Sequence, residues 1–147
     1  MKKAKTSFTY HKNGQQKEII YPTGYMVERK IDEKGKIFEI SDGSGIQKCY
    51  DYDGDLLKAI RTSAGSTYFT YHEGGDLKQI IDPKGFATSY GYDSQHNLKE
   101  VTDGEGRISS YEYNSLNQLT HISLPNGSCK TIEYDSFGRL YRELWGK

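Results

Sequence analysis

The chain has 147 residues, enough for one ordinary domain, and its 20 lysines and arginines balance its 20 aspartates and glutamates. A neutral chain has no net field to attract a polyanion, so the composition argues against nucleic-acid binding. Hydrophobic residues make up only 34%, but 13 tyrosines and 16 glycines favour an all-β, turn-rich protein over a disordered one.

The start of the chain, Met1 to Phe8, is basic like an export signal, but no apolar segment follows it. No apolar run approaches the length of a membrane span. We therefore expect a protein without a membrane span that is cytoplasmic as encoded. Cys49 and Cys129 do not form a disulfide framework, and we expect free thiols in a reducing compartment.

The most informative feature is an internal repeat of about 21 residues, which predicts a single repeat domain over residues 1–147. Each repeat has an anchor residue, in most cases the second tyrosine of a Tyr-x-Tyr phrase. The anchors follow at intervals of 21, 21, 19, 21, 21 and 21 residues: Tyr10, Ile31, Tyr52, Tyr71, Tyr92, Tyr113 and Tyr134.

Within each repeat, the residue pattern predicts two short strands and two turns. The Tyr-x-Tyr phrase has the period of a strand, which places both rings on one face. An Asx residue directly after the anchor can bond the backbone of a first turn. These residues are Asp32, Asp53, Asp93, Asn114 and Asp135. A second strand such as residues 98–102 and a glycine-containing turn such as residues 82–85 complete the repeat.

The leucine and the aliphatic residue of the second strand, such as Leu98 and Val101, are three positions apart, which strict alternation would place on opposite faces. Either a β-bulge lies between them or the leucine belongs to the turn. The stacked repeats predict an antiparallel meander of about 13 strands. Twist is expected to curl this sheet with its tyrosine ladder inward, as an open shell segment or a barrel-like closed sheet.

The stretch from Tyr134 to Leu140 reads Tyr-Asp-Ser-Phe-Gly-Arg-Leu, and Tyr92 to Leu98 repeats it with His96-Asn97 in place of Gly-Arg. This pattern resembles the RHS repeat, also called the YD repeat, from about Phe8 to Leu140. The resemblance is weakest in the first two repeats. It implies an array of hairpins that builds a hollow β-shell, which encloses a toxic C-terminal domain in bacterial Rhs proteins and forms an extracellular scaffold in teneurins. This chain would be a segment or a short stand-alone relative of such a shell.

The tyrosines of the repeated phrase are the candidate binding residues. They are Tyr50, Tyr52, Tyr71, Tyr90, Tyr92, Tyr111, Tyr113 and Tyr134. Such an aromatic stripe could stack sugars or bases. Phenylalanine and isoleucine replace tyrosine at the same positions of other repeats, however, which favours a structural cross-strand ladder.

Other candidate sites are better explained by the repeat. The four histidines occupy three different repeat positions, so no catalytic group or metal ligand set is expected, and no cofactor. The run from Asp51 to Asp55 lacks the glycine and glutamate of an EF-hand loop and is interpreted as a turn. The stretch from Asp82 to Phe86 resembles half of the paired signature at which bacterial shells cleave themselves, but it stands at an ordinary turn position.

These observations predict a non-catalytic structural repeat protein rather than an enzyme. The alternative is a binding or accessory module, either for carbohydrate through the aromatic residues or as an immunity-type partner of a toxin. An uncapped array leaves two sheet edges unpaired. We therefore expect homo-oligomers, with contacts in the terminal regions Phe8 to Tyr25 and Tyr134 to Trp145.

Overall fold

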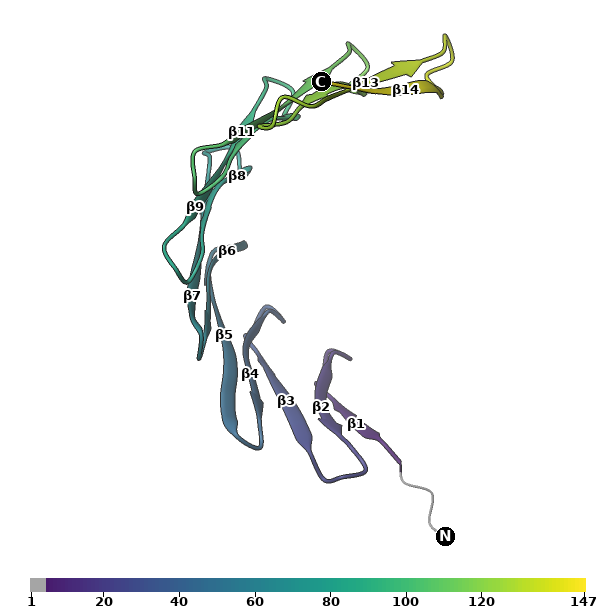
Figure 1. Ribbon diagram of the computed structural model, residues 1–147. Helices are drawn as coiled ribbons and strands as arrows, with labels where there is room; N and C mark the ends of the chain where they lie inside the picture. Colours follow the sequence, from purple (N-terminus) through teal and green to yellow (C-terminus); the bar gives the residue numbers. More distant parts are fainter. Residues whose placement is uncertain (1–4) are drawn as a thin grey trace. The chain divides into compact units, whose positions relative to one another are not determined.

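In the computed structural model, residues 5–147 form fourteen β-strands and no helix (Figure 1). The basic start, residues 1–4, lies outside the described part of the chain. Contacts within the chain define two compact units, Met1–Tyr68 and Phe69–Lys147, whose boundary falls inside β7. Among residues 5–147, no helix is long or apolar enough to cross a membrane.

The first unit contains β1 (Ser7–Tyr10), β2 (Gln16–Ile20), β3 (Met26–Ile31), β4 (Ile37–Asp42), β5 (Gly45–Asp53), β6 (Leu56–Thr62) and most of β7 (Gly65–Tyr71). The second unit contains the end of β7, β8 (Leu77–Ile81), β9 (Ala87–Tyr92), β10 (Leu98–Thr102), β11 (Ile108–Tyr113), β12 (Leu119–Ser123), β13 (Cys129–Tyr134) and β14 (Leu140–Gly146).

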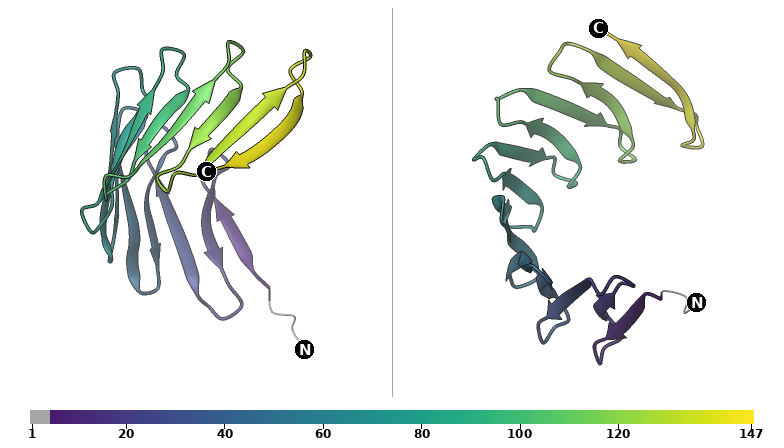
Figure 2. Two further views of the ribbon diagram at one scale, coloured as in Figure 1. Left: turned by 45° about the horizontal axis from the view of Figure 1, so that its top comes forward. Right: turned by 60° about the horizontal axis from the view of Figure 1, so that its bottom comes forward.

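The strands form a meander in which the strand order runs from β1 to β14 without a crossover. Figure 2 shows the hairpins of each unit following one another in chain order. The predicted all-β antiparallel meander is confirmed, with fourteen strands. The order begins at β1 and ends at β14, so of the two arrangements that the sequence left open, the sheet has the one that is not closed.

A β-bulge explains the three-residue spacing of the apolar positions. Leu98 pairs with Tyr92, whereas Glu100 pairs with Gly91, so Lys99 is an extra residue on β10. The extra residue resets the alternation, and Val101 returns to the same face as Leu98, opposite Tyr90. The same register shift recurs in five other hairpins, at Thr9/Tyr10, Lys30/Ile31, Asp51/Tyr52, Glu112/Tyr113 and Glu133/Tyr134.

Most hairpins close with one five-residue turn, which we call a first turn when it follows the anchor and a second turn otherwise. In the first turn at Asp32, the Asp32 N–H donates to the Lys36 carbonyl at 2.8 Å and the Gly35 N–H donates to the Asp32 carbonyl at 3.0 Å. The Asp32 carboxylate accepts bonds from the N–H groups of Lys34 and Lys36. This is the predicted Asx role.

The same side-chain role recurs in both kinds of turn. It is confirmed at Asp93, Asn114 and Asp135 in first turns, and it also occurs at Asp82 and Asp103 in second turns. Asp53 differs because its hairpin has a tighter two-residue turn, and Asp53 pairs with Leu56 in the ladder.

The fourth residue of each five-residue turn takes a left-handed backbone conformation. Glycine fills this position in most turns, as at Gly138 with φ 77°. His96 and Asn117 take it with φ values of 64° and 59°. An L-residue pays about 1–2 kcal/mol for this conformation, and asparagine tolerates it best. The turn at Asp93 therefore keeps its geometry although His96 replaces the glycine of the repeat, and the backbone of His96 is strained.

The sheet has very few buried side chains. Among residues 5–147, the buried hydrophobic residues are Ala59, at 2% exposure, and Ile132, at 7%. Most other apolar side chains in the strands are half-buried against neighbours on the same face. Cross-strand contacts and backbone hydrogen bonds therefore do the work that a packed core does in a globular domain.

Consecutive second turns pack through Phe86 and Gly104. A Cβ atom at position 104 would lie 2.7 Å from Cβ of Phe86 and 3.1 Å from its Cδ1. Glycine is therefore required at this position by the close approach of the neighbouring turn, which leaves no space for a side chain.

We predict that Gly104→Ala lowers the free energy of unfolding by about 1–3 kcal/mol, the usual effect of overpacking. The double variant Phe86→Gly/Gly104→Ala, compared with Phe86→Gly alone, should show little of this loss, because both the clashing Cβ and the ring at position 86 are gone. Urea unfolding followed by circular dichroism measures both. Gly43→Ala is the matched control, since a Cβ there meets nothing within 4 Å. Equal stability of the Gly104 and Gly43 variants would contradict the packing role.

Candidate interaction surface

The eight candidate tyrosines lie on β5, β7, β9, β11 and β13. Within the second unit, the register places Tyr90, Tyr111 and Tyr134 on one face, and in each unit we call the face with the candidate tyrosines the tyrosine face. Their cross-strand partners are aliphatic: Tyr50 pairs with Ile60 and Tyr52 with Leu57. Tyr111 and Tyr113 pair in the same way with Ile122 and Leu119. All eight tyrosines are half-buried. The rings thus form cross-strand ladders within each unit, and their role in ligand binding stays a prediction.

The opposite face carries many of the charged strand side chains, together with apolar ones such as Tyr68 and Ile108. Lys30 and Glu39 form an ion pair of 2.7 Å there. Arg61 and Asp51 form another of 2.6 Å. Exposed pairs of this kind add little stability individually. The tyrosine face carries the aromatic side chains with their aliphatic partners, and it also holds the ion pair of Lys130 with Glu143 at 2.8 Å.

Tyrosine hydroxyls bind successive repeats together, an interaction that we call the tyrosine clamp. The hydroxyl of Tyr113 donates to the carbonyl of Leu98 at 2.9 Å. The same bond, to a residue 15 positions earlier, also joins Tyr52 to Ile37 at 3.0 Å and Tyr134 to Leu119 at 2.9 Å.

The clamp occurs where the backbone ladder between two hairpins ends. The pairing of β10 with β11 stops at Glu100 and Ser110, two residues short of Leu98. The pairing of β12 with β13 likewise stops at His121, two residues short of Leu119. Backbone carbonyls need a donor when they lie away from water. The tyrosine hydroxyl supplies the donor that the neighbouring strand no longer provides.

Burial favours the donor form of these hydroxyls. It raises the pKa of the clamp tyrosines Tyr52 and Tyr113 above the ordinary value of tyrosine. Sequence reasoning missed the clamp, because the exchange of tyrosine with phenylalanine and isoleucine suggested that only the ring matters. The signal that could have found it is the general need of a buried tyrosine hydroxyl for a partner.

The repeat without an anchor tyrosine has a different connection. Ile31 stands at its anchor position, and Gln16 stands where other repeats have leucine or isoleucine. Here Nη1 of Arg29 donates to Oε1 of Gln16 at 2.9 Å. The two departures from the repeat pattern thus compensate each other, with a side-chain bond in place of the clamp.

We predict that Tyr113→Phe lowers the free energy of unfolding by about 1 kcal/mol, because it leaves the Leu98 carbonyl without its donor. Tyr111→Phe is the matched control on the same strand and face, and no partner of the Tyr111 hydroxyl is found in residues 5–147. Chemical denaturation of both variants gives the comparison. The clamp has no energetic role if both substitutions have the same small effect.

A second set of contacts links the first turns of neighbouring repeats. The fifth residue of one first turn contacts the fourth position of the next. In the second unit, Asn97 donates to Oδ1 of Asn117 at 3.0 Å, and Gln118 donates to the carbonyl of Gly138 at 2.7 Å. Asp76 contacts Nδ1 of His96 in the same way. We call this set the turn ladder.

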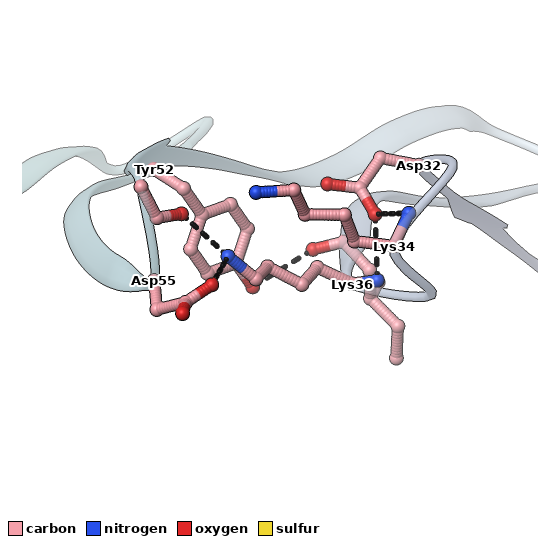
Figure 3. A network of polar contacts seen from close by, with 7 residues as sticks. Asp32, Lys34, Lys36, Tyr52 and Asp55 are labelled. Atoms are coloured by element: carbon pink, nitrogen blue, oxygen red, sulfur yellow. Dashed lines mark hydrogen bonds and ion pairs between the residues drawn. The ribbon is translucent and has the colours of Figure 1, made fainter.

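In the first unit, Lys36 makes the equivalent contact (Figure 3). Its ammonium group lies 2.5 Å from Oδ1 of Asp55, contacts the Gly54 carbonyl, and lies 5.3 Å from the centre of the Tyr52 ring. The hydrogen bond and charge of Lys36 lower the pKa of Asp55. The run from Asp51 to Asp55, which was compared with a calcium-binding loop, therefore contacts the ammonium group of Lys36 through Asp55. Residues 5–147 contain no group of three or more histidine, cysteine or acidic side chains placed to hold a metal ion.

The four histidines also connect repeats. Nε2 of His11 bonds to the carbonyl of Arg29 at 2.9 Å, and Nε2 of His72 bonds to that of Tyr90 at 3.3 Å, in each case 18 residues later. The repeat position that these two share is thereby explained. His96 contacts Asp76 through the turn ladder, and His121 lies 3.4 Å from the hydroxyl of Thr131.

Two histidines that the sequence treated as scattered meet at one open cavity of about 390 Å³. Its lining includes His72, Asp76, Tyr92, Asp93 and His96. The ring of His72 lies edge-on to that of Tyr92, with centroids 6.0 Å apart. Neighbouring turn positions in adjacent repeats could have indicated this proximity. The polar groups of His72, Asp76, Asp93 and His96 already serve a turn or a repeat contact.

The contact with Asp76 raises the pKa of His96, through its hydrogen bond first and its charge second. A raised histidine pKa stabilises the fold fully below the unfolded value of about 6.5, and this contribution is lost as the pH rises through the folded pKa. We predict that NMR titration gives His96 a pKa above about 6.5 and that Asp76→Asn returns it to that value. An unchanged His96 titration in the Asp76 variant would contradict this assignment.

Cys49 and Cys129 are free and half-buried.

The stretch from Asp82 to Phe86 forms a second turn of the ordinary kind, with the Asp82 carboxylate bonded to the N–H groups of Lys84 and Phe86. The residues that resemble half of a cleavage signature therefore form a regular second turn of the repeat.

The repeated hairpin, with its bulge, tyrosine clamp and turn ladder, defines a β-hairpin repeat protein. The family model described as RHS Repeat matches residues 71–108 and 92–128, two overlapping segments that span β8 to β12. Over these residues the match confirms the resemblance to the RHS repeat that the residue pattern indicated.

Solved structures share this fold. The chain is similar to the crystal structure of TcdB2-TccC3-Cdc42 (TM-score 0.79, 15% identity, 96% of this chain) and to that of TcdB2-TccC3 without its hypervariable C-terminal region (0.79, 17%, 96%). It is also similar to the Tc holotoxin pore of Photorhabdus luminescens with a mutated TccC3 (0.76, 16%, 95%). In each case it spans 9% of the matched chain. A comparison with curated proteins finds no match.

Proposed function

We propose that the chain is a non-catalytic wall segment of an RHS-type β-shell. The observation that carries this proposal is the tyrosine clamp, because it uses the most prominent polar groups of the tyrosine face to join one hairpin to the next. The turn ladder uses polar side chains of the first turns in the same way. A surface whose hydroxyl and amide groups bond to neighbouring repeats suits a structural wall better than a catalytic site.

The partner that we propose for this wall is a toxin-type polypeptide. The similar solved structures are complexes of TcdB2 with TccC3, and this supports a toxin-related setting. The half-exposed tyrosine face offers apolar side chains on a chain without net charge, which suits contact with a poorly folded polypeptide rather than with a polyanion. Carbohydrate binding through the same rings is the competing outcome.

A segment exchange tests the wall function. We predict that residues 5–147, placed in the TcdB2-TccC3 protein instead of the segment that they match, allow the protein to assemble and to keep its enclosed polypeptide resistant to protease. A chimera with phenylalanine at positions 52, 113 and 134 is the matched control and should lose protection at lower temperature.

Two results would count against the proposal. A chimera that folds but leaves the enclosed polypeptide open to protease would rule out the wall function. Saturable glycan binding by the isolated chain, lost in Tyr111→Ala but kept in Tyr111→Phe, would favour the binding module instead.

A further inference from the structure

The outer edges of the first and last strands are unpaired within the described residues. β14 pairs with β13, and all seven of its residues are exposed. β1 pairs with β2, and all four of its residues are exposed. Such edges present backbone N–H and C=O groups that readily accept another strand.

The pairing between neighbouring hairpins inside the chain shows which kind of strand fits each edge. Inside the array, the second strand of one hairpin pairs with the first strand of the next, as β12 pairs with β13 through His121 and Thr131. β14 is the second strand of the last hairpin, and β1 is the first strand of the first hairpin. The two free edges are therefore equivalent to the two sides of every internal contact between repeats.

The repeat phase also gives the register of this contact. Arg142 follows His121 by 21 residues, one repeat period. Ser7 precedes the anchor Tyr10 by three residues, as Thr131 precedes the anchor Tyr134. Arg142 therefore takes the place of His121, and Ser7 takes that of Thr131. The neighbouring pair in this register is Glu143 with Thr6.

The exposed side chains at the two edges are those that internal neighbours cover. Phe8 is 49% exposed, whereas Ile132, at the same repeat position, is 7% exposed. Leu140 is 58% exposed, whereas its equivalent Leu119 is half-buried. Tyr10, 61% exposed, has the repeat position of a clamp tyrosine. Joining the two edges would cover all three exposed side chains.

We propose that β14 of one molecule pairs antiparallel with β1 of a second copy of this chain, with Arg142 opposite Ser7 and the Tyr10 hydroxyl bonded to the Leu140 carbonyl. The proposal deepens the wall function and rests on it, because it continues the wall from one molecule to the next. The contact joins two unlike edges, so copies add head to tail and do not stop at a two-fold dimer. Pairing of β14 with itself would lack an anchor tyrosine.

Cysteine cross-linking tests the register. In a Cys49→Ser/Cys129→Ser background, one variant carries Thr6→Cys and another carries Glu143→Cys. Mixed under mild oxidation, they should give a heterodimer on the order of tenfold more abundant than a mixture of Thr9→Cys with Glu143→Cys, because a disulfide needs closely opposed residues. Circular dichroism first confirms that each variant folds.

Three outcomes would overturn the proposal. The first is an equal yield in both mixtures. The second is a Glu143→Cys homodimer as the main product, which indicates β14 paired with itself. The third is a Thr6→Cys/Glu143→Cys double variant that gives only an internally bridged monomer, which indicates that one chain closes on itself.

The association constant tests the clamp at the junction. The mass measured by light scattering should rise with protein concentration, and Tyr10→Phe should raise the midpoint concentration by about twofold to tenfold. Tyr68→Phe, in the middle of the chain, is the matched control and should leave the midpoint unchanged. A monomer across the micromolar range would overturn head-to-tail pairing without touching the wall function, which the segment exchange tests separately.

Discussion

The hydrogen bond from an anchor tyrosine to a carbonyl of the preceding hairpin is the interaction on which the rest of the array depends. A single-layer sheet has no second layer to press its hairpins together, and only Ala59 and Ile132 are buried hydrophobic residues among residues 5–147. The backbone ladders between hairpins end before the first turns. Beyond that point no backbone pair joins the two hairpins, and the tyrosine hydroxyl provides the next bond between them.

The bulge makes this bond possible. It adds one residue between the leucine and the rest of the second strand, as Lys99 does in β10. The leucine side chain then shares the tyrosine face with the aliphatic residue further along the strand. Its carbonyl lies just beyond the last backbone pair, within reach of the next tyrosine. One inserted residue thus sets the apolar ladder and places the carbonyl for the clamp, which explains why the hairpin before each observed clamp carries the bulge.

Much of the fold could be predicted from the sequence because each repeat is specified by local chemistry. The Tyr-x-Tyr phrase, the Asx residue and the glycine determine a strand, a turn and a chain reversal without reference to distant residues. The spacing of Leu98 and Val101 left the bulge undecided, because a bulge depends on pairing with another strand. The open edge was likewise undetermined, because closure depends on accumulated twist over many strands.

The candidate surface was harder to predict than the fold. The sequence identified the eight tyrosines but assigned their importance to the rings, since hydroxyl partners lie on the backbone of another repeat. The contact of His96 with Asp76 and that of Lys36 with Asp55 also depend on the alignment of neighbouring turns. Polar residues that differ from repeat to repeat give no periodic signal, so their partners become visible only in three dimensions.

The linear strand order has a mechanical consequence. Each hairpin contacts its neighbours in the chain, so a load applied along the strand order is carried by one junction after another. Under tension, such an array yields by successive release of hairpins from its ends, and the extension grows in steps of about one repeat. The junction without a tyrosine, at Ile31, relies on the hydrogen bond between the half-buried side chains of Arg29 and Gln16. It is the link where salt and competing hydrogen-bond donors can adjust the stiffness of the whole.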